Sequence, residues 1–227
     1  MYRVEDKFAC SEKDLFLLQA RLQTVLEPDI NQTSSDGYRI TSVYFDDLFD
    51  THLQDTVDGN RLREKYRIRI YNGSFDVIKL EIKYKRDNRV MKRSSSITLE
   101  QMCELMNGNC IQSANESMED PITLFNLAIT NRGLRPKIIV EYDRSAYIYE
   151  PGNVRITLDR NIRGSDQLEA FTKGEKITYE YERELAQVLE VKYDEFLPGF
   201  ISGMLETGNM NQTSYSKYRI CREIKGA

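Results

Sequence analysis

Ionic and apolar side chains alternate along several stretches of this chain, and this alternation constrains the fold more than any other feature. Arg67 and Arg69, for example, alternate with Ile68 and Ile70. Successive side chains of a β-strand point to opposite faces of the sheet, so each such stretch is predicted to be a strand with one apolar and one ionic face. The other ionic faces comprise Glu81, Lys83 and Lys85, then Tyr142 and Arg144, then Arg155, Thr157 and Asp159, and finally Glu190 and Lys192.

Eight strands are predicted, most of them joined as consecutive hairpins with a few helices between them. Asn72-Gly73-Ser74 is one hairpin signal, because Asn-Gly favours the two-residue turn between antiparallel strands. Eight antiparallel strands can close on themselves and so remove their unpaired edges. We therefore expect an α+β fold, an eight-stranded antiparallel β-barrel with flanking helices, as a single domain over residues 1–227. The strands are predicted at 2–8, 38–46, 62–71, 75–85, 89–99, 137–149, 153–162 and 178–193, and the helices at 11–26, 48–57, 99–107, 121–132 and after Pro198.

The ionic faces have two interpretations. In the first, the sheet is half exposed and its charges are solvated on the outside. In the second, the apolar faces point outward beneath helices and the ionic faces line the lumen of the barrel. Two cations about 5 Å apart repel by about 3 kcal/mol at an effective dielectric constant of about 20. A lumen that collects many cations therefore predicts a phosphate-like polyanion as its ligand.

The charge distribution supports a focused anion site. The 227 residues carry a net charge of −4, but residues 61–93 contain twelve Lys and Arg against four acidic residues. A basic segment within an acidic protein favours a specific anion site over general nucleic-acid binding. The single histidine, His52, is expected at the surface of a helix, which leaves almost no basis for histidine zinc sites or Ser-His-Asp triads.

The cysteines and the apolar segments indicate the cellular setting. Cys10, Cys103, Cys110 and Cys221 form no Cys-x-x-Cys pair, and the N-terminus has no apolar signal segment. No apolar run reaches the ~20 residues of a membrane helix. We therefore expect a reduced, cytoplasmic protein with no membrane segment in this chain.

A series of short motifs follows the predicted strands in order. The motifs are Arg3-Val4-Glu5-Asp6-Lys7-Phe8, Tyr44-Phe45-Asp46, Arg67-Ile68-Arg69-Ile70-Tyr71-Asn72-Gly73, Leu80-Glu81-Ile82-Lys83, Glu141-Tyr142-Asp143-Arg144, Val154-Arg155-Ile156-Thr157-Leu158-Asp159, Leu189-Glu190-Val191-Lys192 and Ser216-Lys217-Tyr218. From residue 3 to about 219, the series resembles the polyphosphate polymerase domain of the vacuolar transporter chaperone (VTC) family. That family belongs to the triphosphate tunnel metalloenzymes, so the resemblance implies an eight-stranded barrel that encloses a basic tunnel.

The resemblance also implies the residues of the site. The cations expected to grip the triphosphate and the growing chain, as catalytic residues, are Lys7, Arg67, Arg69, Lys83, Arg144, Arg155 and Lys217. The residues expected to bind substrate beside them are Glu5, Lys85, Lys92, Tyr142, Lys192 and Ser216, with Arg93 in place of Lys92 if the register slips by one residue. Glu190 matches the family's metal-binding carboxylate, which implies a divalent cofactor, Mn²⁺ or Mg²⁺. Alternatively, Glu190 forms a structural ion pair with Lys192 or Arg144.

Departures from the family pattern bear on the activity. The hydrolases of the superfamily carry Glu-x-Glu-x-Lys on the first strand, and Arg3 stands in place of the first Glu. This favours a polymerase that transfers the γ-phosphate of ATP to a growing inorganic polyphosphate chain. Lys85 stands where the eukaryotic polymerases tend to have histidine. No segment resembles their SPX domain or membrane helices, so regulation and translocation by those routes are not expected.

Two other functions stay open at the level of the sequence. The first is a tunnel triphosphatase that hydrolyses inorganic triphosphate or nucleoside triphosphates, for which Glu5 and the same cations suffice. The second is a non-catalytic module for polyphosphate or nucleic acid, with Tyr66, Tyr71, Phe75 and Tyr84 as stacking residues. We expect ATP and inorganic polyphosphate or triphosphate as partners and no nucleic acid, and leave a membrane or protein partner open.

Overall fold

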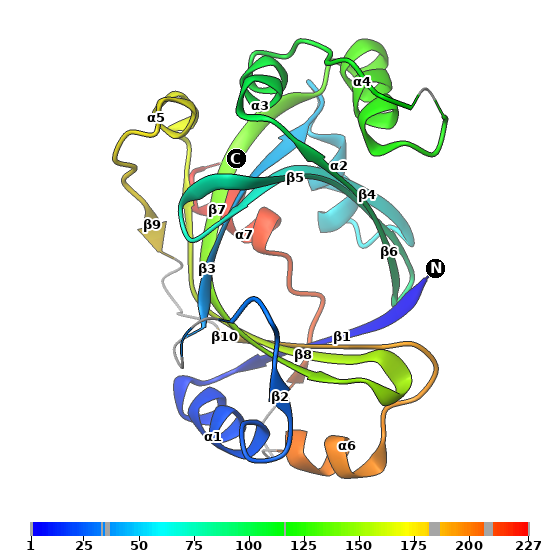
Figure 1. Cartoon of the computed structure of the whole chain (residues 1–227), viewed down its shortest axis with the longest axis vertical. Helices are drawn as coiled ribbons and strands as arrows, with labels where there is room; N and C mark the ends of the chain where they lie inside the picture. The colour runs from blue at the N-terminus through cyan, green and yellow to red at the C-terminus, as the bar shows by residue number, and fades with distance from the viewer. Residues whose placement is uncertain are drawn as a thin grey trace.

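Eight strands close into a ring in the computed structural model, which describes residues 2–32, 34, 37–115, 117–181, 187–206 and 211–226 (Figure 1). The order around the ring is β7-β3-β4-β5-β6-β1-β10-β8, and β8 pairs again with β7, every neighbouring pair being antiparallel. The predicted α+β fold built on an antiparallel barrel is therefore confirmed. The ring strands are β1 (Arg3–Cys10), β3 (Tyr38–Asp46), β4 (Leu62–Tyr71), β5 (Ser74–Arg86), β6 (Arg89–Ile97), β7 (Arg135–Tyr149), β8 (Val154–Ser165) and β10 (Gln187–Tyr193).

Short strands and further helices accompany the ring. β2 (Glu27–Pro28) pairs with β7, β9 (Glu180–Tyr181) pairs with β8, and β11 (Asn211–Gln212) pairs with β1. None of the described helices combines the length and the apolar character needed to cross a bilayer. The helices are α1 (Glu12–Leu22), α2 (Thr51–Val57), α3 (Leu99–Met106), α4 (Pro121–Arg132), α5 (Leu168–Lys173), α6 (Gly199–Leu205) and α7 (Lys217–Ile224), with a short 3₁₀ turn η1 (Pro151–Asn153).

Local sequence signals account for several element boundaries. Asn72 and Gly73 both have positive φ, 53° and 71°, as the two-residue turn between β4 and β5 requires. The Ser11 hydroxyl accepts a hydrogen bond from the backbone N–H of Asp14, and the Asp14 carboxylate accepts one from the N–H of Ser11. This reciprocal cap satisfies two backbone donors at the start of α1, and so fixes where the helix begins.

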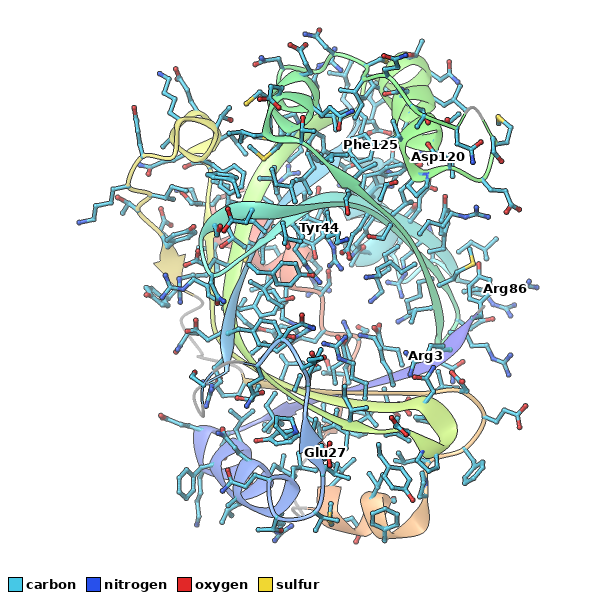
Figure 2. All side chains as sticks on the ribbon, viewed as in Figure 1. Arg3, Glu27, Tyr44, Arg86, Asp120 and Phe125 are labelled. Carbon is cyan, nitrogen blue, oxygen red and sulfur yellow. The ribbon has the colours of Figure 1, made fainter. Side chains whose placement is uncertain are left out.

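Apolar side chains of the ring strands point outward on two sides of the ring, and helices cover them there. α3 and α4 cover the β4–β5–β6 part of the ring, where Ile68, Leu80 and Phe125 are fully buried (Figure 1). α1 and α6 cover the opposite part, where Leu189 is buried. In Figure 2, Phe125 lies between α4 and the ring, whereas Tyr44 points into the ring. The ionic faces therefore line the lumen, and the half-exposed sheet with solvated charges is wrong.

α7 lies inside the ring and closes part of the lumen (Figure 1). Its Tyr218 and Cys221 belong to the same buried cluster as Ile138 and Val140 of β7. The Tyr218 hydroxyl donates a hydrogen bond to the Asp46 carboxylate at 2.6 Å, which attaches α7 to the end of β3. The lumen thus has an apolar section beside the ionic one, which the alternation of charged residues does not predict.

Three predictions from the sequence are wrong in detail. Of the strand predicted over 178–193, residues 178 and 179 lie outside any strand, Glu180–Tyr181 and Gln187–Tyr193 form β9 and β10, and residues 182–186 lie outside the described part of the chain. The helix predicted over 11–26 ends at Leu22, beyond which the Thr24 hydroxyl donates to the carbonyl oxygen of Arg21. His52 is 1% exposed instead of lying at the surface, and its ring packs against Tyr66 with the ring centroids 5.4 Å apart.

Candidate active site

A cavity of about 320 Å³ lies in the lumen, and its wall is strongly cationic. Among the described residues, thirteen lysines and arginines line it, together with two acidic residues, Glu5 and Glu190. All the site residues predicted from the sequence lie on this wall, although they come from seven ring strands and the start of α7. Their roles stay predictions. These residues are Glu5, Lys7, Arg67, Arg69, Lys83, Lys85, Lys92, Tyr142, Arg144, Arg155, Glu190, Lys192, Ser216 and Lys217.

Sequence reasoning misses three cations of the wall, Arg3, Arg63 and Lys65. Arg63 and Lys65 continue the alternation of Arg67 along β4 toward the N-terminus, so extending that pattern would have identified them. Tyr44 also lines the cavity and accepts a hydrogen bond from Arg67 Nη1 at 2.9 Å. Tyr44 is a single tyrosine within a mostly apolar strand, so no alternation of charged residues identifies it as part of the wall.

Glu81 lies behind the wall and holds three of its cations. Glu81 Oε2 accepts a hydrogen bond from Arg67 Nε at 2.7 Å and lies 3.7 Å from Arg69 Nη1, and Oε1 accepts one from Lys92 Nζ at 2.7 Å. Burial by itself would raise the pKa of Glu81, but the three cations hold this pKa well below its ordinary value. Arg93 points away from the lumen and donates to a loop carbonyl, so the register brings Lys92 to the wall instead.

Asp159 pairs with the cations near α7, as Glu81 does with those of β4 and β6. Its carboxylate accepts hydrogen bonds from Arg144 Nε and Nη2 at 2.6 and 2.7 Å and lies 2.7 Å from Lys217 Nζ. Burial would raise the pKa of Asp159, but Arg144 and Lys217 lower it to about 2. Both cations lie over the ring of Tyr142, at 5.2 and 4.8 Å from its centroid. Tyr142 also accepts a hydrogen bond from Arg69, which joins the two clusters.

Glu5 and Glu190 share three lysines on the wall itself. Lys83 Nζ donates to both carboxylate oxygens of Glu5 at 2.7 and 2.9 Å, Lys7 Nζ lies 3.3 Å from Glu190, and Lys192 contacts both carboxylates. Burial would raise the pKa of each carboxyl group, but the lysines hold both well below their ordinary values. Burial lowers the pKa of Lys83 to about 7, since Lys7 and Lys192 offset part of the attraction of Glu5. The pKa of Lys83 therefore lies close to neutral pH.

The aromatic residues of the basic segment do not form a stacking platform. Tyr66 is 4% exposed in the core outside the ring, and Phe75 and Tyr84 pack against that core. Tyr71 packs against Tyr38, with the ring centroids 6.3 Å apart. Stacking on bases requires accessible ring faces, so these four residues give no support to a nucleic-acid-binding surface.

The acidic residues of the wall suit a metal ion only in combination with phosphate. Within the described residues, no group of three His, Cys, Asp or Glu side chains could hold a metal. Mg²⁺ in phosphate-handling sites is usually bound by one or two carboxylates together with phosphate oxygens of the substrate. Glu190, with Glu5 beside it, fits that donor set. These residues therefore fit a divalent ion that is shared with a bound phosphate chain.

Comparison with protein families decides the membership of this chain. A family model described as VTC domain matches residues 2–224. The chain belongs to the VTC domain family. The match spans every strand of the ring and the whole wall of the cavity, so the VTC domain as a unit contains the candidate site. The resemblance to the VTC family noted in the sequence is thereby confirmed.

Solved structures share the fold of this VTC domain. HpAC1 from Hippeastrum, described as having a dominant triphosphatase activity, is 13% identical with a TM-score of 0.58, and the match covers 97% of this chain and 95% of that chain. A proposed adenylate cyclase from Vibrio parahaemolyticus is 12% identical with a TM-score of 0.53, over 100% of this chain and 99% of that chain. At such identities the similarity shows the fold alone. The comparison with curated proteins finds no match.

Proposed function

We propose that this VTC domain transfers the γ-phosphate of ATP to the end of an inorganic polyphosphate chain inside the cavity and releases ADP. The observation that carries the proposal is the composition of the wall, where thirteen lysines and arginines accompany two acidic residues within the described part of the chain. An enclosed excess of positive charge favours a ligand with several negative charges. Membership of the VTC domain family supports phosphoryl transfer as the class of reaction.

The proposed reaction exchanges one P–O bond for another. The bond from the γ-phosphorus to the oxygen that bridges it to the β-phosphate breaks, and a bond to a terminal oxygen of the polyphosphate chain forms. Phosphoryl transfer requires mainly positioning and stabilisation of negative charge from the protein. Arg67 and Arg69 suit this task because guanidinium groups bind phosphate oxygens in a fixed fork, whereas Lys217 acts as a point charge. The acceptor oxygen is already ionised at neutral pH, so the reaction needs no general base.

The buried carboxylates keep these cations in place before substrate arrives. Glu81 fixes Arg67 through hydrogen bonds, and Asp159 fixes Arg144 in the same way. Such preorganisation means that little reorganisation is needed when the charge of the transferred group develops. A divalent ion, Mn²⁺ or Mg²⁺, bound by Glu190 and phosphate oxygens would supply further compensation for that charge.

A triphosphatase is the second candidate function. The solved structure of HpAC1, which shares the fold, is described as having a dominant triphosphatase activity. Glu5 and Lys7, both on the wall, stand at the second and third named positions of the Glu-x-Glu-x-Lys motif of the hydrolases. In this alternative, water takes the place of the polyphosphate end as acceptor, and free phosphate is the product.

The products formed from ATP distinguish these functions. We expect purified protein with ATP and Mn²⁺ or Mg²⁺ to release ADP and to form a ladder of polyphosphate chains on a gel. Release of free phosphate without chains, under every metal tried, would assign the triphosphatase. Tight binding of polyphosphate with no turnover of ATP would assign a binding module. Cys10, Cys103 and Cys110 are free thiols, as is usual in a reducing compartment, and we propose the cytoplasm as the location.

The affinity for inorganic triphosphate should fall as the pH rises above about 7. Lys83 has a pKa of about 7 in the free protein, and a bound anion raises the pKa of a neighbouring ammonium group. The complex then holds more protons than the free protein, so raising the pH disfavours binding, by up to about tenfold per pH unit. Metal-free calorimetry in buffers of different ionisation enthalpy measures this proton uptake. In the Lys83→Met variant, the affinity for triphosphate should fall less steeply with pH than in the wild type. The same pH dependence of affinity in the variant and the wild type would contradict the prediction.

A further inference from the structure

The counter-ions of the cavity are unevenly distributed among its cations. Among the described residues, ten of the thirteen lysines and arginines on the wall have a carboxylate oxygen within 4.0 Å. The three others are Arg63, Lys65 and Lys85, which form no ion pair with any described carboxylate. We name these three residues the unpaired cluster. Adjacent cations without counter-ions repel one another and lower the stability of the fold. Their presence therefore indicates a role in binding an anion.

The unpaired cluster is a compact patch on two neighbouring strands. Arg63 of β4 lies directly opposite Lys85 of β5, and Lys65 lies directly opposite Lys83. Like charges directly opposite each other destabilise an antiparallel pair. The Nε atom of Arg63 is buried and has no hydrogen-bond partner within the described residues. A donor in this state is available for a ligand.

Lys65 connects this patch to the start of α7. Its Nζ donates to the Ser216 hydroxyl at 2.7 Å and lies 5.6 Å from the ring centroid of Tyr218. Burial lowers the pKa of Lys65 well below its ordinary value, and the neighbouring cations lower it further. Burial and the charge of Arg63 also lower the pKa of Lys85. An anion placed among these three side chains would relieve both effects.

The unpaired cluster borders the paired cations, because Lys65 lies opposite Lys83, and it extends away from them toward the start of β4. Arg63 precedes Arg67 by four residues on the same face of β4, which places them about 13 Å apart along the strand. Glu81 compensates part of the charge of Arg67 and its neighbours, and Asp159 part of that of Arg144 and Lys217. A donor that exchanges at every turnover suits the paired cations, because its release leaves less of their charge uncompensated than at the unpaired cluster. A chain that stays bound while donors exchange suits the unpaired cluster.

We propose that Arg63, Lys65 and Lys85 form an acceptor subsite, which holds the polyphosphate chain while the donor triphosphate occupies the paired cations. This inference rests on the proposed polymerase function and adds to it the place of the acceptor. It predicts that binding of a long chain and binding of a triphosphate depend on different residues of one cavity. A triphosphatase has no need of such a subsite.

The double variant Arg63→Gln and Lys65→Gln tests the subsite by calorimetry with two probes. Affinity for a long-chain linear polyphosphate should fall by about tenfold or more, whereas affinity for inorganic triphosphate should stay within about threefold. In elongation assays the KM for added polyphosphate should rise while kcat at saturating polyphosphate stays unchanged. The single variant Arg63→Lys, which keeps the charge, should retain most of the affinity for the long chain.

Arg61→Gln is the matched control for this experiment. Arg61 comes just before β4, at the same end of the β4–β5 hairpin, but it is exposed and paired with Asp87 at 2.6 Å. Its replacement should leave both affinities unchanged. Equal loss of both ligands in the double variant, or no loss of the long chain, would overturn the subsite.

Two further measurements distinguish failure of the acceptor subsite from failure of the proposed function and from misfolding of a variant. Failure of the wild-type protein to make chains from ATP would remove the proposed function, whatever the variants bind. Chain synthesis by the wild type, with unchanged KM for polyphosphate in the double variant, would remove the subsite alone. Because the substitutions reduce like-charge repulsion, the melting temperature should not fall. If a variant still fails to fold, wild-type protein that binds long polyphosphate no more tightly than triphosphate contradicts the subsite.

Discussion

Replacing Glu81 with glutamine should lower the free energy of unfolding by about 3 kcal/mol or more, a fall of about 10 °C in melting temperature. Glu81 is fully buried and is, among the described residues, the one carboxylate within 4.0 Å of Arg67, Arg69 and Lys92. Without its charge, these three cations remain together with no compensation. Thermal and urea unfolding measure the loss.

Two comparisons show whether charge is the cause. Glu119→Gln removes an exposed carboxylate that lies 3.8 Å from Arg93, and it should change the free energy of unfolding by less than about 1 kcal/mol. Adding Lys92→Gln to Glu81→Gln removes one uncompensated cation and should restore part of the stability. A Glu81→Gln protein as stable as the wild type would mean that the wall does not concentrate positive charge as described.

Replacing Arg69 with glutamine should lower kcat by about 10²–10³-fold with little effect on folding. Arg69 is buried on the wall, where it donates to the hydroxyls of Ser42 and Tyr142 at 3.2 Å, and its nearest carboxylate contact is 3.7 Å away. Most of its charge is therefore available to the transferred phosphate, and its loss leaves Glu81 still paired with two other cations. Steady-state production of ADP from ATP measures kcat.

Arg93→Gln is the control for the loss of one positive charge. Arg93 follows Lys92 on β6 but points away from the cavity, so its replacement should leave kcat unchanged. Unfolding of both variants should differ from the wild type by about 1 kcal/mol or less. A fully active Arg69→Gln protein would exclude Arg69 from the proposed stabilisation of the transferred phosphate.

The sequence predicts the architecture because one periodicity determines both faces of the strands. Ile68 and Leu80 are apolar, so their faces of the strands are expected to be buried. Arg67 and Glu81 then lie on the opposite faces of the same strands. What periodicity leaves open is which face is the inside. The sequence resolved this question through the resemblance to a tunnel family, and the closed ring agrees with it.

Other features depend on contacts between distant segments, which no local pattern reports. Tyr218 enters the lumen because its hydroxyl reaches Asp46, 172 residues earlier in the chain. His52 is buried because α2 packs against β4 through Tyr66. Arg63 and Lys65 are a different case, since they follow the alternation of β4 and could have been predicted from it.

A structure of the protein with inorganic triphosphate tests the central claim most directly. Our account predicts that the anion lies inside the ring, with phosphate oxygens within hydrogen-bonding distance of Arg67, Arg69 and Lys217. Triphosphate bound only on the outer surface of the barrel, or an empty lumen at saturating triphosphate, would contradict it.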